Sequence, residues 1–158
     1  MRTHNHYRNI VAGLALTLPM SASHAQVVID KLWVRAMPPT QTMTAAYGSV
    51  TNHGNEAIII EGVNASFAGK ATLHSSVSDG ESVRMAAMGS VTLAPHESLV
   101  LTPGGNHIML MDVGRMPSAN SSVQICFDTS AQPVCAMAKV LRDAPASQHD
   151  DHQHHMNH

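Results

Sequence analysis

Residues 73–109, LHSSVSDGESVRMAAMGSVTLAPHESLVLTPGGNHIM, carry the pattern that most clearly identifies the fold of this chain. Short runs rich in Val, Ile, Leu and Thr alternate here with Gly, Pro, Asn and Asp, and a long 3.6-residue period is absent. Such runs between turn residues are typical of strands in a β-sandwich or barrel. We therefore predict an all-β fold, with strands in this part of the chain at 71–76, 82–88, 98–102 and 107–113.

Five further runs of the same kind lie on either side, at 27–36, 46–52, 57–64, 122–127 and 134–141. Nine short strands in about one hundred residues fit a sandwich with strands of ordinary length. No internal repeat and no linker separates the first run from the last. The sequence therefore predicts one β-sandwich domain, residues 26–143.

The first 25 residues have the pattern of a secretory signal peptide. Arg2 and Arg8 precede an apolar run at 10–18, and Ser23-His24-Ala25 resembles a cleavage site. Such an apolar run is too short to cross a membrane as a helix. We expect cleavage after Ala25, export to the periplasm and no membrane insertion afterwards. At the other end, residues 144–158 are polar and rich in histidine, so we expect a disordered tail.

The charge balance excludes some classes of partner. Without Arg2 and Arg8, seven basic residues face eleven acidic ones. Nothing in this balance attracts nucleic acid or an anionic membrane. No nucleophile elbow, glycine-rich phosphate loop or pair of carboxylates at a useful spacing is present, so we do not expect an enzyme.

Two cysteines in an exported chain favour a disulfide over free thiols. The runs 122–127 and 134–141 read as a hairpin with Ile125, Phe127 and Val134 facing inward. Pairing Phe127 with Val134 places Cys126 directly opposite Cys135, both facing outward. We predict this bridge; the alternatives are two free thiols or a thiol pair that itself holds metal.

Four possible metal ligands occur within residues 73–109, namely His74, Met85, His107 and Met109. Because side chains alternate along a strand, His107 and Met109 share one face while Ile108 faces the core. The Asp-Gly turn after the His74 run favours pairing of that run with the one carrying Met85. Two neutral imidazoles and two thioethers suit Cu(I) better than Zn(II) or a hard cation.

A simpler interpretation of these residues is that the methionines fill the core and the histidines lie solvated at the surface. Other side chains have similar alternatives. Met88 and Met111 are near enough to act as alternate ligands. Trp33 and Arg35 could wall the site, although a core tryptophan and a surface arginine is the simpler account. His53 and His96 are more simply explained as solvated turn residues than as ligands.

The spacing His-x10-Met-x21-His-x-Met, with Pro-Gly-Gly before the second histidine and Met-Leu-Met after it, resembles the periplasmic copper chaperone family PCu(A)C. The segments Trp33–Arg35, Met37–Pro39, Ala46-Tyr47 and Thr51-Asn52 also fall where that family has similar residues. The resemblance covers the whole mature domain. It implies a cupredoxin-like β-sandwich that binds Cu(I) through His74, Met85, His107 and Met109.

Two features depart from the family pattern. Gly48 stands where a larger apolar residue is usual, which puts the local packing in question. Cys126 and Cys135 are not part of the pattern.

The resemblance implies a copper chaperone that passes Cu(I) towards the copper sites of respiratory oxidases. Its partner would be a thiol-bearing oxidase subunit or assembly factor, and we expect the protein itself to be a monomer. The alternative is a copper-scavenging or resistance protein that binds without delivery, and the same site serves both. An electron-transfer cupredoxin is set aside, because no histidine follows Cys135 until His149.

The tail carries a second set of possible ligands. Residues 149–158 read HDDHQHHMNH, and imidazole with carboxylate prefers Cu(II) to Cu(I). We expect this segment to capture Cu(II) for the domain, the alternative being adventitious binding by a solvated tail. The ligands would be His149, His152, His154, His155 and His158.

Overall fold

The computed structural model describes residues 27–78 and 82–145. The predicted signal peptide and all but the first two residues of the predicted tail therefore lie outside the described residues. The described chain forms ten β-strands, which confirms the predicted all-β class. No helix long and apolar enough to cross a membrane occurs in this part of the chain. The strands are β1 (Val27–Arg35), β2 (Thr44–Asn52), β3 (Ile58–Ala65), β4 (Ala68–Ser78), β5 (Val83–Ala87), β6 (Val91–Leu93), β7 (Ser98–Leu101), β8 (His107–Val113), β9 (Ser122–Thr129) and β10 (Val134–Leu141).

Nine of these strands correspond to the nine predicted runs, and β6 was missed. It is only three residues long, below the usual length of a strand. β6 exists as a strand because it pairs with β3, where Ile58 lies opposite Leu93 and both side chains are buried. That partner is distant in sequence, so local pattern gave no sign of the strand.

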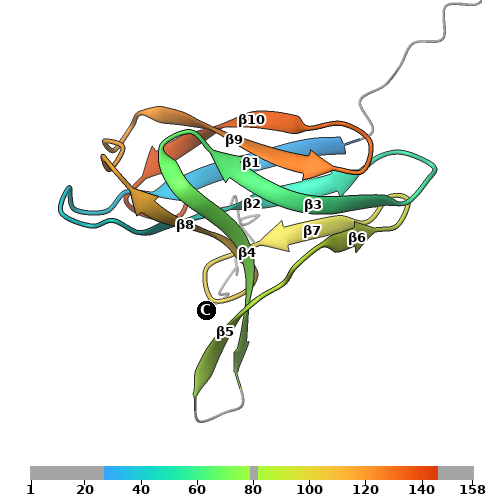
Figure 1. The fold of residues 1–158 in the computed structure, drawn as a ribbon, viewed down its shortest axis with the longest axis horizontal. Helices are drawn as coiled ribbons and strands as arrows, with labels where there is room; N and C mark the ends of the chain where they lie inside the picture. The colour runs from blue at the N-terminus through green and yellow to red at the C-terminus, as the bar shows by residue number, and fades with distance from the viewer. Residues whose placement is uncertain (1–26, 79–81, 146–158) are drawn as a thin grey trace, which may run out of the picture.

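Hydrogen bonds connect the strands in the order β5-β4-β8-β2-β1-β10-β9-β3-β6, and β7 pairs with β2 beyond the end of β8. Among the described strands, β1 and β10 pair in parallel and the other pairs are antiparallel. Figure 1 shows the strands curled over into a sandwich, from which the β4–β5 hairpin extends away. The hairpin and β8 together present one outward face.

The core is filled by side chains that alternate inward along the strands. Ile108 and Leu110 on β8 have no exposed surface, and neither do Ile125 and Phe127 on β9. Burying a side chain of this size stabilises the fold by roughly 1.5–3 kcal/mol. The inward direction of Ile108 and Leu110 is as predicted, so His107 and Met109 face the other way.

A β-bulge in β1 changes which of its side chains face the core. The pairing with β2 shifts between Asp30 and Trp33, and Lys31 in this interval has a positive φ of 52°. Val27, before the bulge, faces the core, and so do Leu32 and Val34 after it. The residues that face the core therefore change from odd-numbered to even-numbered across the bulge. Trp33 therefore points away from the core cluster.

Gly48 on β2 lies directly against this bulge. Its φ is +151°, and a Cβ atom there would lie 2.9 Å from the Asp30 carbonyl oxygen and 3.0 Å from the Leu32 Cα atom. Backbone atoms cannot move aside as a flexible side chain can. The close approach of the β1 backbone therefore explains why glycine stands here in place of a larger apolar residue. Gly48 packs tightly against β1.

Asn52 is a fully buried polar residue at the end of β2. Its Nδ2 atom donates to the carbonyl oxygens of Glu56, Leu93 and Ala94 at 2.8, 3.2 and 3.1 Å. Its Oδ1 atom accepts from the Gly54 amide at 2.9 Å. Because each buried amide group has a partner, the side chain joins β2 to two turns without the cost of an unsatisfied group.

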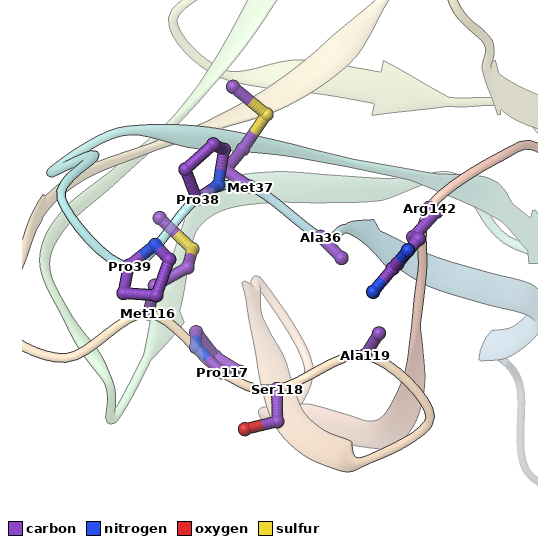
Figure 2. A pocket seen from close by; sticks show the side chains of 9 residues that line it. All are labelled: Ala36, Met37, Pro38, Pro39, Met116, Pro117, Ser118, Ala119 and Arg142. Carbon is purple, nitrogen blue, oxygen red and sulfur yellow. The ribbon is translucent and has the colours of Figure 1, made fainter.

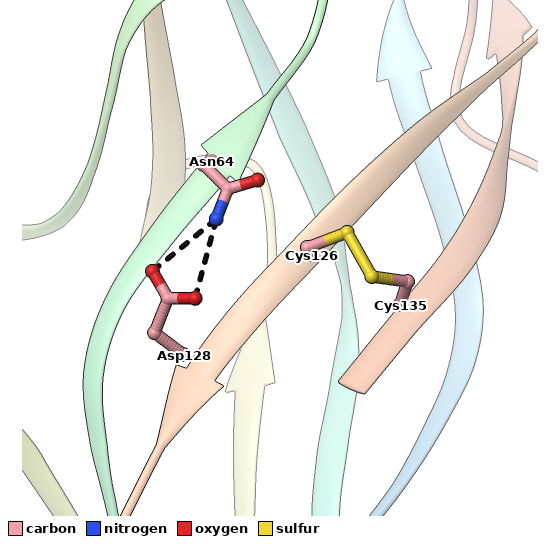
Figure 3. The surroundings of a disulfide bond; sticks show 4 residues. All are labelled: Asn64, Cys126, Asp128 and Cys135. Atoms are coloured by element: carbon pink, nitrogen blue, oxygen red, sulfur yellow. Dashed lines mark hydrogen bonds between the residues drawn. A yellow bond between two sulfur atoms is a disulfide. The ribbon is translucent and has the colours of Figure 1, made fainter. Parts of the chain in front are cut away.

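The β9–β10 hairpin has the predicted register, with Phe127 opposite Val134 and Cys126 opposite Cys135. The structure joins the two cysteines in a disulfide (Figure 3). Beside it, Asn64 on β3 donates to both carboxylate oxygens of Asp128, at 3.3 and 3.2 Å. These contacts connect β3, β9 and β10 at the surface.

We predict that Gly48→Ala destabilises the domain by about 2 kcal/mol, because the added methyl meets backbone atoms of β1 and the φ suits glycine. Urea denaturation followed by circular dichroism measures this. Gly114→Ala is the control, since a Cβ at Gly114 meets nothing within 4 Å. Equal stability of the two variants would contradict the close packing of Gly48.

Candidate metal centre

The centre is built around two histidines that face each other on adjacent strands. His74 on β4 and His107 on β8 are direct register partners, with ring centroids 5.9 Å apart and planes inclined by 30°. Their neighbours Leu73 and Ile108 are buried in the core, so alternation places both rings on the opposite face. His107 is buried and His74 is half-buried.

A backbone acceptor fixes the proton of His107. Its Nδ1 atom lies 2.9 Å from the Gly105 carbonyl oxygen, which can only accept a hydrogen bond. The Nδ1–H group must therefore donate, and the lone pair lies on Nε2. A ring oriented by this type of contact is typical of a metal-ligating histidine.

His74 has one ring nitrogen with a partner and one without. Its Nε2 atom lies 2.9 Å from the Thr72 hydroxyl oxygen, whereas its buried Nδ1 atom has no hydrogen-bond partner among the described residues. A buried polar atom without a partner costs free energy. Coordination of a metal by Nδ1 would satisfy it.

The pKa of His74 is held below its ordinary value of 6.5. Burial of the ring is the largest cause, and the nearby His107 and Lys70 lower the pKa further because they disfavour another positive charge. The ring is therefore neutral at pH 7, which is the form that binds a metal.

The two predicted methionine ligands lie on the same face as the histidines. Met109 is two residues beyond His107 on β8 and pairs with Thr72. Met85 on β5 pairs with Ser76, which is two residues beyond His74 on β4. Register thus brings all four predicted ligands to one face of β5, β4 and β8, while coordination by them stays a prediction.

Exposure argues against a core-filling role for these methionines. Met85 is 60% exposed, and Met109 is half-buried but lies outside the core cluster. Met88, in contrast, packs against the core, which accounts for it without a metal. Met111 lies two residues further along β8 and shares the face of Met109.

Aromatic side chains adjoin the histidine pair, where the sequence favoured a core tryptophan and a surface arginine over residues that wall the site. The Tyr47 ring lies 6.4 Å from that of His107 and 4.7 Å from that of Trp33, and the Arg35 guanidinium lies 5.8 Å from the Tyr47 centroid. Trp33 is buried, but on the histidine face. Arg35 is half-buried rather than a plain surface residue. The bulge in β1 causes both differences, and no local signal in the sequence reveals it.

The donors on this face are imidazoles and thioethers. No group of three or more His, Cys, Asp or Glu that could hold a metal occurs among residues 27–78 and 82–145. The turn histidines His53 and His96 are exposed, as expected of solvated residues. The predicted tail ligands lie outside the described residues. A soft, uncharged donor set of this kind favours Cu(I) over Zn(II), which takes thiolate, imidazole and carboxylate.

A separate surface pocket of about 530 Å³ lies between residues 36–39, residues 116–119 and Arg142 (Figure 2). Arg142 reaches into it from one side, and prolines and methionines line the other. None of the four predicted ligands lines this pocket. It is therefore distinct from the metal centre.

Solved structures with a similar fold include PCuAC domains. The apo PmoF2 PCuAC domain has a TM-score of 0.64 and 21% identity, covering 79% of this chain and 98% of that domain. The copper-bound PCuAC domain from PmoF2 gives 0.64 and 20%, covering 77% and 97%. Apo-DR1885 from Deinococcus radiodurans gives 0.58 and 25%, covering 89% and 97%. The fold is therefore the cupredoxin-like β-sandwich, as predicted.

Sequence comparison identifies the family. Residues 27–140 match the family described as "Putative lipoprotein LpqE-like". A relative from Leifsonia xyli subsp. xyli, "Putative lipoprotein Lxx21020", is 32% identical over an alignment of 138 positions that covers 82% of this chain and 82% of the relative. The family match runs from the first residue of β1 to the penultimate residue of β10. This chain belongs to the LpqE-like family and has the fold of PCuAC domains.

Proposed function

We propose that the protein binds Cu(I) through His74, Met85, His107 and Met109 and carries it in the cell envelope. The observation that carries this proposal is the facing pair of histidines, each with a ring nitrogen free for a metal, on a face that also bears two methionines. The copper-bound PmoF2 domain supports it, since a protein of the same fold holds copper.

The donor set matches the chemistry of Cu(I). A monovalent soft cation binds thioether sulfur and neutral imidazole well, and neither donor needs to lose a proton near neutral pH. The lowered pKa of His74 keeps its ring neutral. Cys126 and Cys135 are joined to each other, so in this oxidised form they do not compete for the metal.

The exposure of one ligand favours transfer over storage. Met85 is 60% exposed and lies on a hairpin that extends from the body of the sandwich (Figure 1). An incoming thiolate from an acceptor can therefore replace the Met85 thioether while His107, which is buried, still holds the metal. We propose delivery to a thiol-bearing respiratory oxidase subunit or its assembly factor, by a monomeric donor.

The proposed location is the periplasm. The relatives are named lipoproteins, a class of protein attached to the cell envelope. Residues 1–25 have the pattern of an export signal. A periplasmic site would give the carrier access to membrane-bound oxidases from the outer side of the membrane.

We predict that Met85→Leu and Met109→Leu each weaken Cu(I) binding at least about tenfold, equivalent to about 1.4 kcal/mol. Leucine keeps the apolar volume but lacks the soft donor. Anaerobic competition against a chromogenic Cu(I) chelator measures the affinity. The matched control is Met137→Leu on β10, since Met137 is 59% exposed and Met85 60%. Unchanged affinity in both ligand variants would exclude the proposed donor set.

We predict that Cu(I) affinity is nearly constant above pH ~6.5 and falls below it, because protons then compete for the imidazoles. Since the pKa of His74 is lowered, its contribution to the fall should begin at a lower pH than for an ordinary histidine. The same competition assay, run from alkaline to acidic pH, tests this. Affinity that kept rising steeply above neutral pH would point to a different ligand, such as a thiol.

We predict that Cu(I)-loaded protein transfers its metal to an apo oxidase copper domain with free thiols. The two proteins are mixed anaerobically, separated by ion exchange and assayed for copper. Transfer should be faster from Met85→Leu than from Met137→Leu loaded to the same level, because the position at which the acceptor thiolate enters is then already vacant. Retention of copper by the wild-type protein would favour the scavenging alternative.

A further inference from the structure

Soft donors continue along the metal-centre face beyond the four proposed ligands. Met111 follows Met109 by two residues on β8, and the residue between them, Leu110, is fully buried. Met109 and Met111 therefore face the same way. Along a strand, residues two apart are separated by roughly 6.5 Å, so the second thioether is within a short distance of the first.

A third methionine joins this row from β2. Thr44 and Ala46 are buried, so Ala45 faces outward, and it pairs with Met109. Thr44 pairs with Leu110, and continuing that register by one residue places Met43 beside Met111. The Val113 amide donates to the Thr42 carbonyl oxygen at 3.0 Å, which shows that the two chains stay hydrogen-bonded past this point.

The two added methionines are not needed by the core. Met43 is 45% exposed, Met111 is half-buried, and neither belongs to the core cluster or packs against it. Neighbouring side chains on adjacent strands have β-carbons roughly 5 Å apart, and methionine is long and flexible enough to bring two sulfur atoms to one ion.

We propose that Met43 and Met111 form a second, weaker site for a soft monovalent cation, with Met109 as a donor shared with the main centre. Three thioethers form an uncharged donor set that selects Cu(I) or Ag(I) over hard cations and Zn(II). The inference goes beyond the four-ligand centre and does not require delivery to any partner.

Two features make this site weaker than the main centre. It contains no imidazole, and Lys70 on β4 pairs with Met111, so a positively charged side chain is a cross-strand neighbour of this site. A neighbouring positive charge lowers the affinity for a cation. A weak site beside a strong one suits metal in transit, since an ion held by Met43 and Met111 needs only to move past Met109 to reach the histidines.

The test is an anaerobic Cu(I) titration of the protein labelled with 13C at the methionine methyl groups. The Met85 and Met109 signals should change during the first equivalent. The Met43 and Met111 signals should change together only afterwards, with at least about a tenfold weaker affinity, while Met137 stays unchanged. Single Met→Leu variants assign the signals.

The double variant Met43→Leu/Met111→Leu should lose the second binding event and keep the first. Because both side chains lie outside the core, the variant should fold, which circular dichroism checks. The proposal is overturned if the Met43 and Met111 signals do not respond to excess Cu(I), or if the double variant retains the second event. Loss of the first event alone would instead contradict the four-ligand centre.

Discussion

The register between β4 and β8 is the constraint on which both core and metal centre depend. His74 lies opposite His107, and Leu73 lies opposite Ile108, so each strand contributes alternately to the two faces. A slip of one residue would turn a histidine into the core and expose an isoleucine. Hydrophobic burial therefore fixes the positions of the two histidines proposed to bind metal, and these histidines need no contacts of their own to be held opposite each other.

The bulge in β1 gives the centre its aromatic boundary. Without the shift at Lys31, Trp33 would share a face with Val27 inside the core. With it, the Trp33 ring packs at a tilt against Tyr47, which in turn adjoins His107. Gly48 allows the bulge by leaving room for the β1 backbone. The bulge in β1 thus determines both the packing of β1 against Gly48 and the aromatic surroundings of His107, a proposed ligand.

Features that depend on residues close together in the sequence could be predicted, and features that depend on distant strands could not. Strand alternation and turn residues are local, so the outward direction of His107 and Met109 and the register of Cys126 with Cys135 could be predicted. Strand β6 and the position of Trp33 could not, because each depends on a strand far away in sequence. The ligand set itself came from a family resemblance, and alternation shows only that its members can meet.

The parallel pairing of β1 with β10 joins the first described strand to the last near the middle of the strand order. Any partial chain that lacks the C-terminal strand leaves β1 and β9 with open hydrogen-bonding edges. Contacts between residues so distant in sequence make folding slow and cooperative. Synthesis of the chain from its N-terminus therefore cannot complete the sheet until nearly the last residue of the domain is available. Until β10 has been made, the strand edges that it will cover on β1 and β9 remain open to other partners.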